Sequence, residues 1–383
     1  MRVLFVISVR GHGRGGHFHS LNHIAAALGE NTEVGICSFG VNKSEVISNN
    51  SLFKKHFLFN GKNIFSLKRE INKYIKEFKP DIIHCFDINA YNLLTLLVDS
   101  KNNIVLNHCG GPNPVEFPFV ENLILFSKEN QTWFENQNKF QKSSIYLIPN
   151  RVNKKELVLD KALRPLTKKD VFCFVRISRI GKVYKKSIED SIRLIEQTKK
   201  KGADVHLYII GTIEDEMVFS NFKLQCENLP VTFLTDNVYT KKASNMLYLA
   251  DAVIATGRGV MEATGLGIPI LTPAKNATLP ILVSKNNFES FLATNFSQRN
   301  VSNKVDIQTN LIDICRLIED KETYKALKNE SMAFFDKYFD VEGAVPKYIE
   351  VYKNVIDQPK TNKRKLMNFK YQLKTIYSFL KNG

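Results

Sequence analysis

The chain has 383 residues, enough for two domains that each bury a hydrophobic core. Hydrophobic residues make up 44% and charged residues 24%, values typical of a soluble globular protein, and no apolar run approaches the roughly 18 residues of a membrane span. The net charge of +16 predicts an anionic partner, whether nucleic acid, membrane lipid or a charged substrate.

The cysteines and the N-terminus indicate where the protein works. No two of the six cysteines stand at metal-ligand spacing, and a disulfide framework is not expected in a chain of this size. Buried, reduced thiols in a cytoplasmic protein are the expectation. Residues Met1–Ser8 are too short for a signal peptide and run directly into a glycine-rich loop, so they predict a first strand.

Apolar strand candidates alternate with helical patterns along the chain, which predicts parallel sheets covered by helices. In the first half, strands are expected at Arg2–Val9, Glu33–Ser38, Asp81–Cys85, Asn103–Asn107, Asn122–Phe126 and Ile145–Ile148. In the second half, they are expected at Val171–Ile177, Val205–Ile210, Val231–Leu234, Ala252–Ala255 and Pro269–Leu271.

The alternation stops and restarts across Pro149–Asp170, a polar stretch with two prolines that we interpret as a linker. We therefore expect an α/β fold of two Rossmann-like domains, at residues 1–158 and 159–345, with a ligand cleft between them. Helices at 346–383 are expected to cross back to the first domain. Ligands of such sheets bind at the carboxyl ends of the strands.

Two basic segments, 43–79 and 360–383, carry apolar residues at helical spacing. Segment 43–79 has nine Lys or Arg against three Glu, with Ser66 as the expected N-cap of its helix. Segment 360–383 has seven basic residues, no acidic one, and an apolar stripe of Leu366, Phe369, Leu373, Ile376, Tyr377 and Leu380. Both predict contact with an anionic membrane surface. The alternative is that both helices pack on the protein body with their basic faces in water. No nucleic-acid module accompanies the charge, so nucleic acid is not expected.

The first loop, Gly11–Gly16, fits the pattern G-x-G-x-x-G of dinucleotide-binding proteins. That pattern also requires an acidic residue at the end of the second strand. The second strand here ends in Ser38-Phe39-Gly40, which has no carboxylate, so NAD binding is disfavoured.

The segment Thr256–Pro269 combines a strand end, a glycine-rich turn and a helix start. Backbone N–H groups and the positive end of the helix make such a turn an anion site. Glu262, expected in the first turn of this helix, offers a carboxylate that accepts hydrogen bonds from vicinal sugar hydroxyls. Together these features favour a nucleotide sugar over a bare phosphate. The alternative is an ordinary strand-turn-helix corner.

This segment resembles the donor site of the GT4-type retaining glycosyltransferases, which have the GT-B fold. That family usually shows Glu, seven residues, Glu, Ala and a small-residue turn with Gly-x-Pro, and Glu262 matches the second Glu. The first would stand at position 254, which is Ile254, so this chain lacks the carboxylate that usually contacts the donor hexose in that family. The resemblance implies Glu262 on the ribose and a donor-binding helix end at Gly257, Arg258, Gly259 and Val260.

Arg179 and Lys185 resemble the family's cationic pair that holds the donor diphosphate, with Lys186 as the alternative to Lys185. Fixed cations stabilise the charge that develops on a leaving nucleoside diphosphate. There is no Asp-x-Asp of the metal-dependent transferases, so neither a metal nor another cofactor is expected. The alternative is a solvated basic loop.

Further matches lie in the first domain. His108, after the fourth expected strand, resembles in position the His that faces the donor sugar, whereas His84 lies inside a strand and is expected to be structural. Gly15 and Gly16 match a glycine-rich loop that approaches the donor phosphate or the acceptor. The acceptor contacts expected are His17, His19 and Asp87.

The resemblance runs from the first strand to about Pro273. It implies a retaining enzyme that moves a sugar from a nucleotide-diphosphate sugar, with UDP favoured, to a glycan or lipid-linked acceptor of surface polysaccharide synthesis. The first domain would bind the acceptor and the second the donor, at the cytoplasmic face of the plasma membrane. Another GT-B enzyme, such as an epimerase or an inverting transferase, and a non-catalytic glycan-binding or partner-binding protein remain the alternatives.

Overall fold

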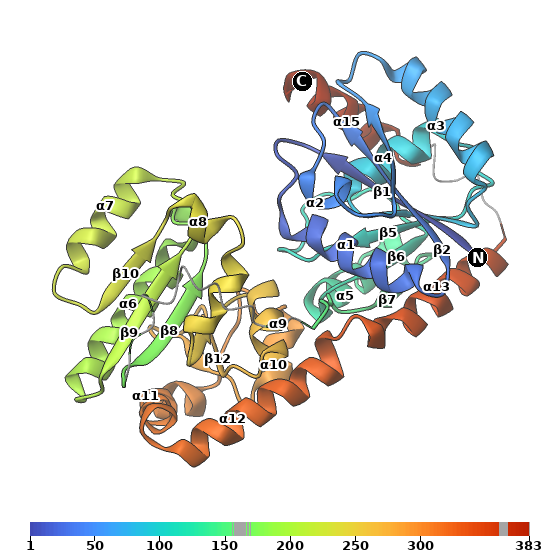
Figure 1. Cartoon of the computed structure of the whole chain (residues 1–383). Coiled ribbons are helices and arrows are strands. Elements are labelled where there is room, and N and C mark those ends of the chain that lie inside the picture. Colours follow the sequence, from blue (N-terminus) through green and yellow to red (C-terminus); the bar gives the residue numbers. More distant parts are fainter. Residues whose placement is uncertain (155, 157–165, 167, 169, 360–366, 383) are drawn as a thin grey trace. The chain divides into compact units, whose positions relative to one another are not determined.

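A computed structural model describes residues 1–154, 156, 166, 168, 170–359 and 367–382 (Figure 1). The chain divides into two compact units. The first comprises Met1–Asn153 with Val341–Gly383, and the second comprises Lys154–Asp340. The sequence placed the two boundaries after residues 158 and 345, and much of the expected linker lies outside the described residues.

The first unit is built on a parallel seven-stranded sheet in the order β3-β2-β1-β4-β5-β6-β7. Its strands are β1 (Arg2–Val9), β2 (Glu33–Gly40), β3 (Phe53–Leu58), β4 (Ile82–Cys85), β5 (Ile104–His108), β6 (Asn122–Leu125) and β7 (Ser144–Leu147). Its helices are α1 (Gly16–Gly29), α2 (Glu45–Ser48), α3 (Ile64–Phe78), α4 (Ile88–Leu97), α5 (Lys128–Glu135), α13 (Val345–Asp357) and α15 (Phe369–Asn382).

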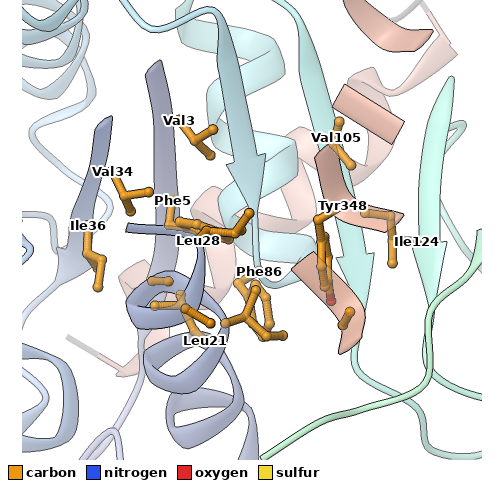
Figure 2. Close-up of a cluster of buried hydrophobic side chains, with 14 of the residues drawn as sticks. Val3, Phe5, Leu21, Leu28, Val34, Ile36, Phe86, Val105, Ile124 and Tyr348 are labelled. Atoms are coloured by element: carbon orange, nitrogen blue, oxygen red, sulfur yellow. The ribbon is translucent and has the colours of Figure 1, made fainter. Parts of the chain in front are cut away.

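Helices cover both faces of this sheet. Successive residues of a strand point to opposite faces, and the strands carry apolar residues at successive positions, so both faces need to be covered. Val3 and Phe5 of β1 pack in one cluster with side chains of α1 and α13, which Figure 2 shows through Leu21, Leu28 and Tyr348. Leu4 and Val6 of β1 point to the other face, where they pack in a second cluster with α3, α4 and Phe379 of α15. The sheet is therefore buried on both faces.

A buried histidine links the C-terminal segment to this sheet. His84 of β4 is fully buried, and its Nδ1 lies 2.8 Å from the hydroxyl of Tyr352 on α13. Burial lowers the pKa of His84 from 6.5 to about 3, so the ring is neutral at physiological pH. This is the structural role expected from its position inside a strand.

The second unit has a six-stranded sheet in the order β10-β9-β8-β11-β12-β13, parallel except for the edge strand β13. Its strands are β8 (Phe172–Ile177), β9 (Val205–Ile210), β10 (Val231–Leu234), β11 (Ala252–Ile254), β12 (Ile270–Thr272) and β13 (Ile281–Leu282). Its helices are α6 (Lys185–Lys200), α7 (Glu216–Gln225), α8 (Asn237–Thr240), α9 (Arg258–Gly265), α10 (Phe288–Ala293), α11 (Lys304–Glu319) and α12 (Lys321–Phe334). The α/β fold class predicted from the alternating pattern is confirmed in both units.

Segment 43–79 differs from the expectation in two respects. The segment contains the edge strand β3, which the sequence analysis missed because lysines interrupt its apolar residues, as is common on edge strands. The helix that follows begins at Ile64 with Asn63 as its N-cap, so Ser66 is not the cap. Ser66 lies within the first turn, where its hydroxyl donates to Glu70 Oε1 at 3.2 Å.

None of the helices in the described ranges combines the length and apolar character that crossing a membrane requires.

Candidate functional site

A pocket of about 440 Å³ opens in the second unit at the carboxyl ends of β8, β9 and β11. The chain leaves β8 for β9 and β10 on one side and returns to β11 on the other, so the pocket lies at the point where the strand order reverses. It is lined by Ile177, Ser178, Arg179, Tyr184, Ile210, Gly211, Thr212, Thr240, Ala243, Thr256, Gly257 and Arg258. Three of these residues, Arg179, Gly257 and Arg258, were candidates from the sequence.

Arg179 brings a fixed positive charge to this pocket. Its Nη1 lies 2.6 Å from Glu214 Oε1, and its guanidinium carbon lies 5.4 Å from the centre of the Tyr184 ring. The contacts with Tyr184 and Glu214 raise the pKa of Arg179, so the side chain stays cationic at every physiological pH. The guanidinium is still partly exposed and can meet an anion in the pocket.

The two lysine candidates differ in the strength of their contacts within the second unit. Lys186 Nζ lies 2.6 Å from Asp190 Oδ2 and 2.9 Å from the carbonyl oxygen of Ala277. Lys185, the first residue of α6, has a looser ion pair, with its Nζ 3.8 Å from Glu189 Oε1. Neither lines the pocket, and Lys185 has the weaker internal contact to give up for a ligand.

Beneath the pocket, a buried arginine holds the loop that carries Tyr184. Arg176 of β8 is almost fully buried, and its Nη2 donates to Ser187 Oγ at 2.6 Å. Ser187 Oγ in turn donates to the carbonyl oxygen of Tyr184 at 2.9 Å. Burial lowers the pKa of Arg176 to about 10, which leaves it charged at neutral pH. This role of Arg176 was not predicted, although a charged residue inside an apolar strand is a usable signal in the sequence.

The turn before α9 requires a glycine at position 257. Gly257 is the N-cap of the helix with φ 49° and ψ −118°, a backbone conformation that other residues rarely adopt. The N–H groups of Gly259 and Val260 donate to the carbonyls of Thr256 and Gly257, so they are turned inward. Of the expected donor-binding residues Gly257 to Val260, the last two therefore have backbone N–H groups that are already hydrogen-bonded within the turn.

Glu262 lies in the second turn of α9, because the helix begins at Arg258 and has no acidic residue in its first turn. The expectation of a first-turn carboxylate was wrong in this respect. Glu262 is largely buried, and its Oε1 accepts a hydrogen bond from Arg258 Nε at 2.9 Å. It does not line the pocket, whereas Arg258 does.

In the first unit, the candidates follow the carboxyl ends of β1, β4 and β5. Asp87, directly after β4, caps α4 by accepting hydrogen bonds from the N–H groups of Asn89 and Ala90 at 2.8 and 2.9 Å. It also accepts from the N–H and the hydroxyl of Ser8, at 2.6 and 2.8 Å. These contacts join β1 to β4 and give Asp87 a structural role beside the predicted acceptor contact.

The structure brings His17 close to Asp87. His17 lies in the first turn of α1 and interacts electrostatically with the Asp87 carboxylate. Burial lowers the pKa of His17, and the Asp87 charge opposes this in part, so the imidazole is neutral at physiological pH. His19 lies two residues further along α1 and is half-buried.

His108, at the end of β5, packs within an aromatic cluster, with ring centres 5.3 Å from Phe117 and 6.0 Å from Phe134. Burial lowers its pKa to about 4, and its Nε2 has no hydrogen-bond partner among the described residues. The ring is therefore neutral at physiological pH, and its Nε2 is buried.

The two glycines at the start of α1 differ in the space around them, because a Cβ added to Gly15 would lie 2.9 Å from His17 Cε1. Gly15 is the N-cap and Gly16 the first helical residue, and a Cβ added to Gly16 would meet no atom within 4 Å. Packing within the unit therefore does not demand glycine at position 16. Over the described part of the chain, no group of His, Cys, Asp and Glu side chains could hold a metal ion.

Residues 160–333 match the family model described as "Glycosyl transferases group 1". Among solved structures, Anabaena HepE in complex with UDP and glucose is 16% identical with a TM-score of 0.64, over 92% of this chain and 100% of that chain. The pneumococcal O-GlcNAc transferase GtfA, in complex with UDP and GlcNAc, is 10% identical with a TM-score of 0.62, over 94% of this chain and 99% of that chain.

The UDP-GlcNAc 2-epimerase from Neisseria meningitidis, bound to UDP-GlcNAc, is 13% identical with a TM-score of 0.55, over 92% of this chain and 100% of that chain. No curated protein sequence matched. At these identities the structural similarities establish the fold, and they confirm the predicted GT-B class of two Rossmann-like units.

Proposed function

We propose that this chain, of which residues 160–333 match the family model of the glycosyl transferases of group 1, is a retaining GT4-type enzyme that transfers a sugar from a UDP-sugar. The observation that carries this proposal is the pocket at the strand ends of the second unit, which joins the cation Arg179 to the N-terminus of α9. A nucleoside diphosphate needs both, because its charge is spread over two phosphates. UDP is bound in the similar structures of HepE and GtfA, which supports uracil as the base.

Arg179 and Lys185 are the proposed contacts of the diphosphate. As the glycosidic bond breaks, the leaving UDP gains negative charge, and cations already in place lower the energy of that transition state. Arg179 is held by Glu214 and stacked near Tyr184, so little reorganisation is needed when charge develops. In this scheme no metal ion or other cofactor is required.

Glu262 is the proposed acceptor for the ribose hydroxyls of the donor. Its Oε1 is bonded to Arg258, so ribose binding involves an exchange in which Arg258 turns towards the phosphates in the pocket that it lines. Arg258, which is half-buried, would thus meet the phosphates and leave the Glu262 carboxylate to accept from the hydroxyls. His108, neutral in the first unit, is the proposed contact of the donor sugar.

The first unit is the proposed site of the acceptor, with Gly15, Gly16, His17, His19 and Asp87 as its contacts. A glycan or lipid-linked acceptor in bacterial-type surface polysaccharide synthesis agrees with the net charge of +16, which attracts the protein to anionic lipid. We place the reaction at the cytoplasmic face of the plasma membrane.

A second function stays open because of position 254. Ile254, fully buried in β11, stands where the family usually has a Glu, and the similar fold of the Neisseria epimerase accommodates UDP-GlcNAc. An epimerase, an inverting transferase and a non-catalytic binding protein are therefore the alternatives.

The test is to incubate the protein with UDP-glucose, UDP-galactose and UDP-GlcNAc, with water as acceptor, and to follow UDP release and the sugar anomer by proton NMR. We expect UDP and the α-anomer from an α-linked donor. The β-anomer would identify an inverting enzyme, and isomerised UDP-sugar without UDP release would identify an epimerase. Neither UDP nor a changed sugar would favour the non-catalytic protein.

A further inference from the structure

Helix α15 turns three polar residues and Phe379 towards the core of the first unit, and it leaves most of its other apolar residues outward. The residues that face the first unit include Asn368, Gln372 and Thr375, which are at most 4% exposed. The outward side carries Phe369, Leu373, Tyr377 and Leu380, which are 58%, 49%, 66% and 42% exposed. A helix of a globular protein ordinarily buries its apolar stripe against the core, so this orientation needs an explanation.

Hydrogen bonds rather than apolar packing hold much of the inward face. α15 lies against α4 (Figure 1), where Asn92 Nδ2 donates to Thr375 Oγ1 at 3.0 Å and Gln372 Nε2 donates to Thr95 Oγ1 at 3.3 Å. Before the first turn, Asn368 accepts from the N–H of Phe119 at 2.7 Å and donates to its carbonyl at 2.8 Å. These directional contacts fix the rotation of the helix, so the outward apolar stripe is a built feature.

Exposed apolar residues continue beyond both ends of this stripe. At the first turn of α15, Glu116 binds Lys370 and Lys374 at 3.1 and 2.7 Å, and its neighbour Val115 is 99% exposed. At the last turn, the loop at Gly61 packs against Leu380, and residues on either side of this loop, Leu58 and Phe65, are 61% and 83% exposed. We call the stripe together with these three residues the α15 surface.

Basic residues border the stripe on the same outward side. Lys370, Lys374 and Lys381 follow one another at helical spacing, about a quarter-turn away from the apolar residues. Glu116 offsets one of these three positive charges through its ion pairs with Lys370 and Lys374, and α15 itself contains no acidic residue. An apolar stripe beside a row of lysines is the pattern of a helix that lies in a membrane interface, where the apolar side chains enter the acyl boundary and the lysines meet anionic headgroups.

The other basic helix lacks this arrangement. On α3, the apolar stripe of Leu67 and Ile71 is buried in the core of the first unit, with Tyr74, Ile75 and Phe78 packed against it. Apart from Phe65 in its first turn, α3 presents mainly polar and charged side chains to solvent. Both helices pack on the protein body, but α3 buries its apolar stripe there, whereas α15 leaves most of its stripe exposed.

We infer that the α15 surface is the membrane-docking face of this protein and that it inserts Phe369, Leu373, Tyr377 and Leu380 into the interface of an anionic bilayer. This deepens the proposed function, because it assigns the expected membrane contact to one helix and to one mode of binding. A second copy of the chain is a poorer occupant, since a symmetric contact through α15 would bring two rows of lysines together. An anionic lipid surface instead complements them.

The test uses the full chain with the double substitution Leu373→Gln/Tyr377→Gln, whose targets are exposed enough for the fold to tolerate polar replacements. The matched control is Met217→Gln/Leu224→Gln on α7 of the second unit, where the two side chains are 73% and 67% exposed. Binding is measured by co-sedimentation with vesicles of phosphatidylcholine containing one quarter phosphatidylglycerol, at low and high salt. Circular dichroism and UDP-dependent thermal stabilisation are recorded for each variant.

We expect the α15 variant to lose about tenfold or more in vesicle partitioning while the control binds like the wild type, because apolar insertion supplies much of the affinity. Partitioning of the wild type should fall with salt without vanishing. Equal binding of the α15 variant and the wild type would overturn the inference. So would sedimentation of the wild type as a dimer that the α15 variant dissociates.

These results are separable from the proposed function. A protein that binds vesicles through α15 but does not respond to UDP would refute the transferase proposal and leave the docking face standing. A protein that responds to UDP but does not bind the vesicles at either salt concentration would refute the docking face and leave the transferase proposal standing.

Discussion

Arg179 lies at the rim of the pocket with its charge held by Glu214 and Tyr184, and it can be tested without disturbing a core. We expect Arg179→Ala to lower kcat/KM for the UDP-sugar by about 10² or more, because a positioned cation in such a site contributes a few kcal/mol to the transition state. Steady-state measurement of UDP release gives the value.

Lys200→Ala is the matched control for this substitution. Lys200 is an exposed residue at the far end of α6, paired with Glu196 at 2.8 Å, so it removes one positive charge from the same unit away from the pocket. An equal loss of activity in the control would mean that net charge rather than placement matters, and would contradict the role of Arg179.

The Ser187 hydroxyl connects the buried Arg176 to the loop at Tyr184, so its removal should act on stability first. Ser187→Ala leaves Arg176 Nη2 without this acceptor in a buried place, which should lower the free energy of unfolding by about 1–3 kcal/mol. Urea unfolding measures this. A change within experimental error would show that Arg176 finds another partner and that the Ser187 bond is dispensable.

Sequence patterns predicted those site residues that sit in a recognisable local context. Arg179, Gly257 and Arg258 follow strand ends, and all three line the pocket. Glu214 and Tyr184 were missed, because what makes them important is their contact with Arg179 across different loops, and such contacts have no fixed spacing in the sequence. The pairing of Glu262 with Arg258 was not predicted either, although the two stand four residues apart on one helix, a spacing at which side chains meet.

At the scale of elements, the start of α9 depends on one backbone conformation. Gly257→Ala should destabilise the second unit by about 1–2 kcal/mol and weaken UDP binding, because a side chain at φ 49° and ψ −118° is strained and would reorient the helix end. Thermal unfolding with and without UDP measures both effects.

Gly259→Ala, inside the same helix, is the control that distinguishes backbone strain at position 257 from the effect of an added methyl group. Its backbone has no positive φ, and its new methyl group would lie 3.2 Å from Ala255 Cβ, a contact that a small shift relieves. Comparable losses in both variants would show that the added methyl group, and not the turn at position 257, is responsible.

The contact between β4 and α13 predicts how stability depends on pH. The pKa of His84 falls from 6.5 to about 3 on folding, so the unfolded chain binds a proton below pH 6.5 that the folded chain does not. Stability is therefore full above pH 6.5 and falls as the pH drops, by up to about 1.4 kcal/mol per unit from this group.

His84→Asn, which keeps an amide near the position of Nδ1, should be less stable than the wild type at pH 7. Its free energy of unfolding should change less between pH 6.5 and 4. Urea unfolding at several pH values tests this. An unchanged slope would mean that other groups, such as His108 with its pKa of about 4, govern the acid loss.

Element prediction succeeded for β1 and β9, which are buried on both faces, and for the edge strand β10, and the bounds of all three match the expectation. It failed for β3 and β13, since an edge strand with lysines and a strand of two residues give no clear apolar run. The helical pattern near the C-terminus was read correctly as amphipathic. Periodicity alone could not show that the apolar stripe of α15 faces outward, because that depends on the polar contacts with α4.

At the scale of the whole molecule, the C-terminal segment from Val341 belongs to the first unit although it follows the second in sequence. Each unit has its own core, so a ligand of the second unit should stabilise that unit directly. Thermal unfolding should then show a UDP effect on the transition of the second unit.

The measurement that tests the central claim most directly is thermal stabilisation by UDP, GDP, ADP, CMP and NAD at saturating concentration without metal, in the wild type and in Arg179→Ala. Ligand at 100 times its Kd adds about 2.7 kcal/mol, which amounts to a shift of several degrees. The account predicts a shift with UDP that is strongly reduced in Arg179→Ala. A shift with NAD alone, or no shift with any nucleotide, would contradict it.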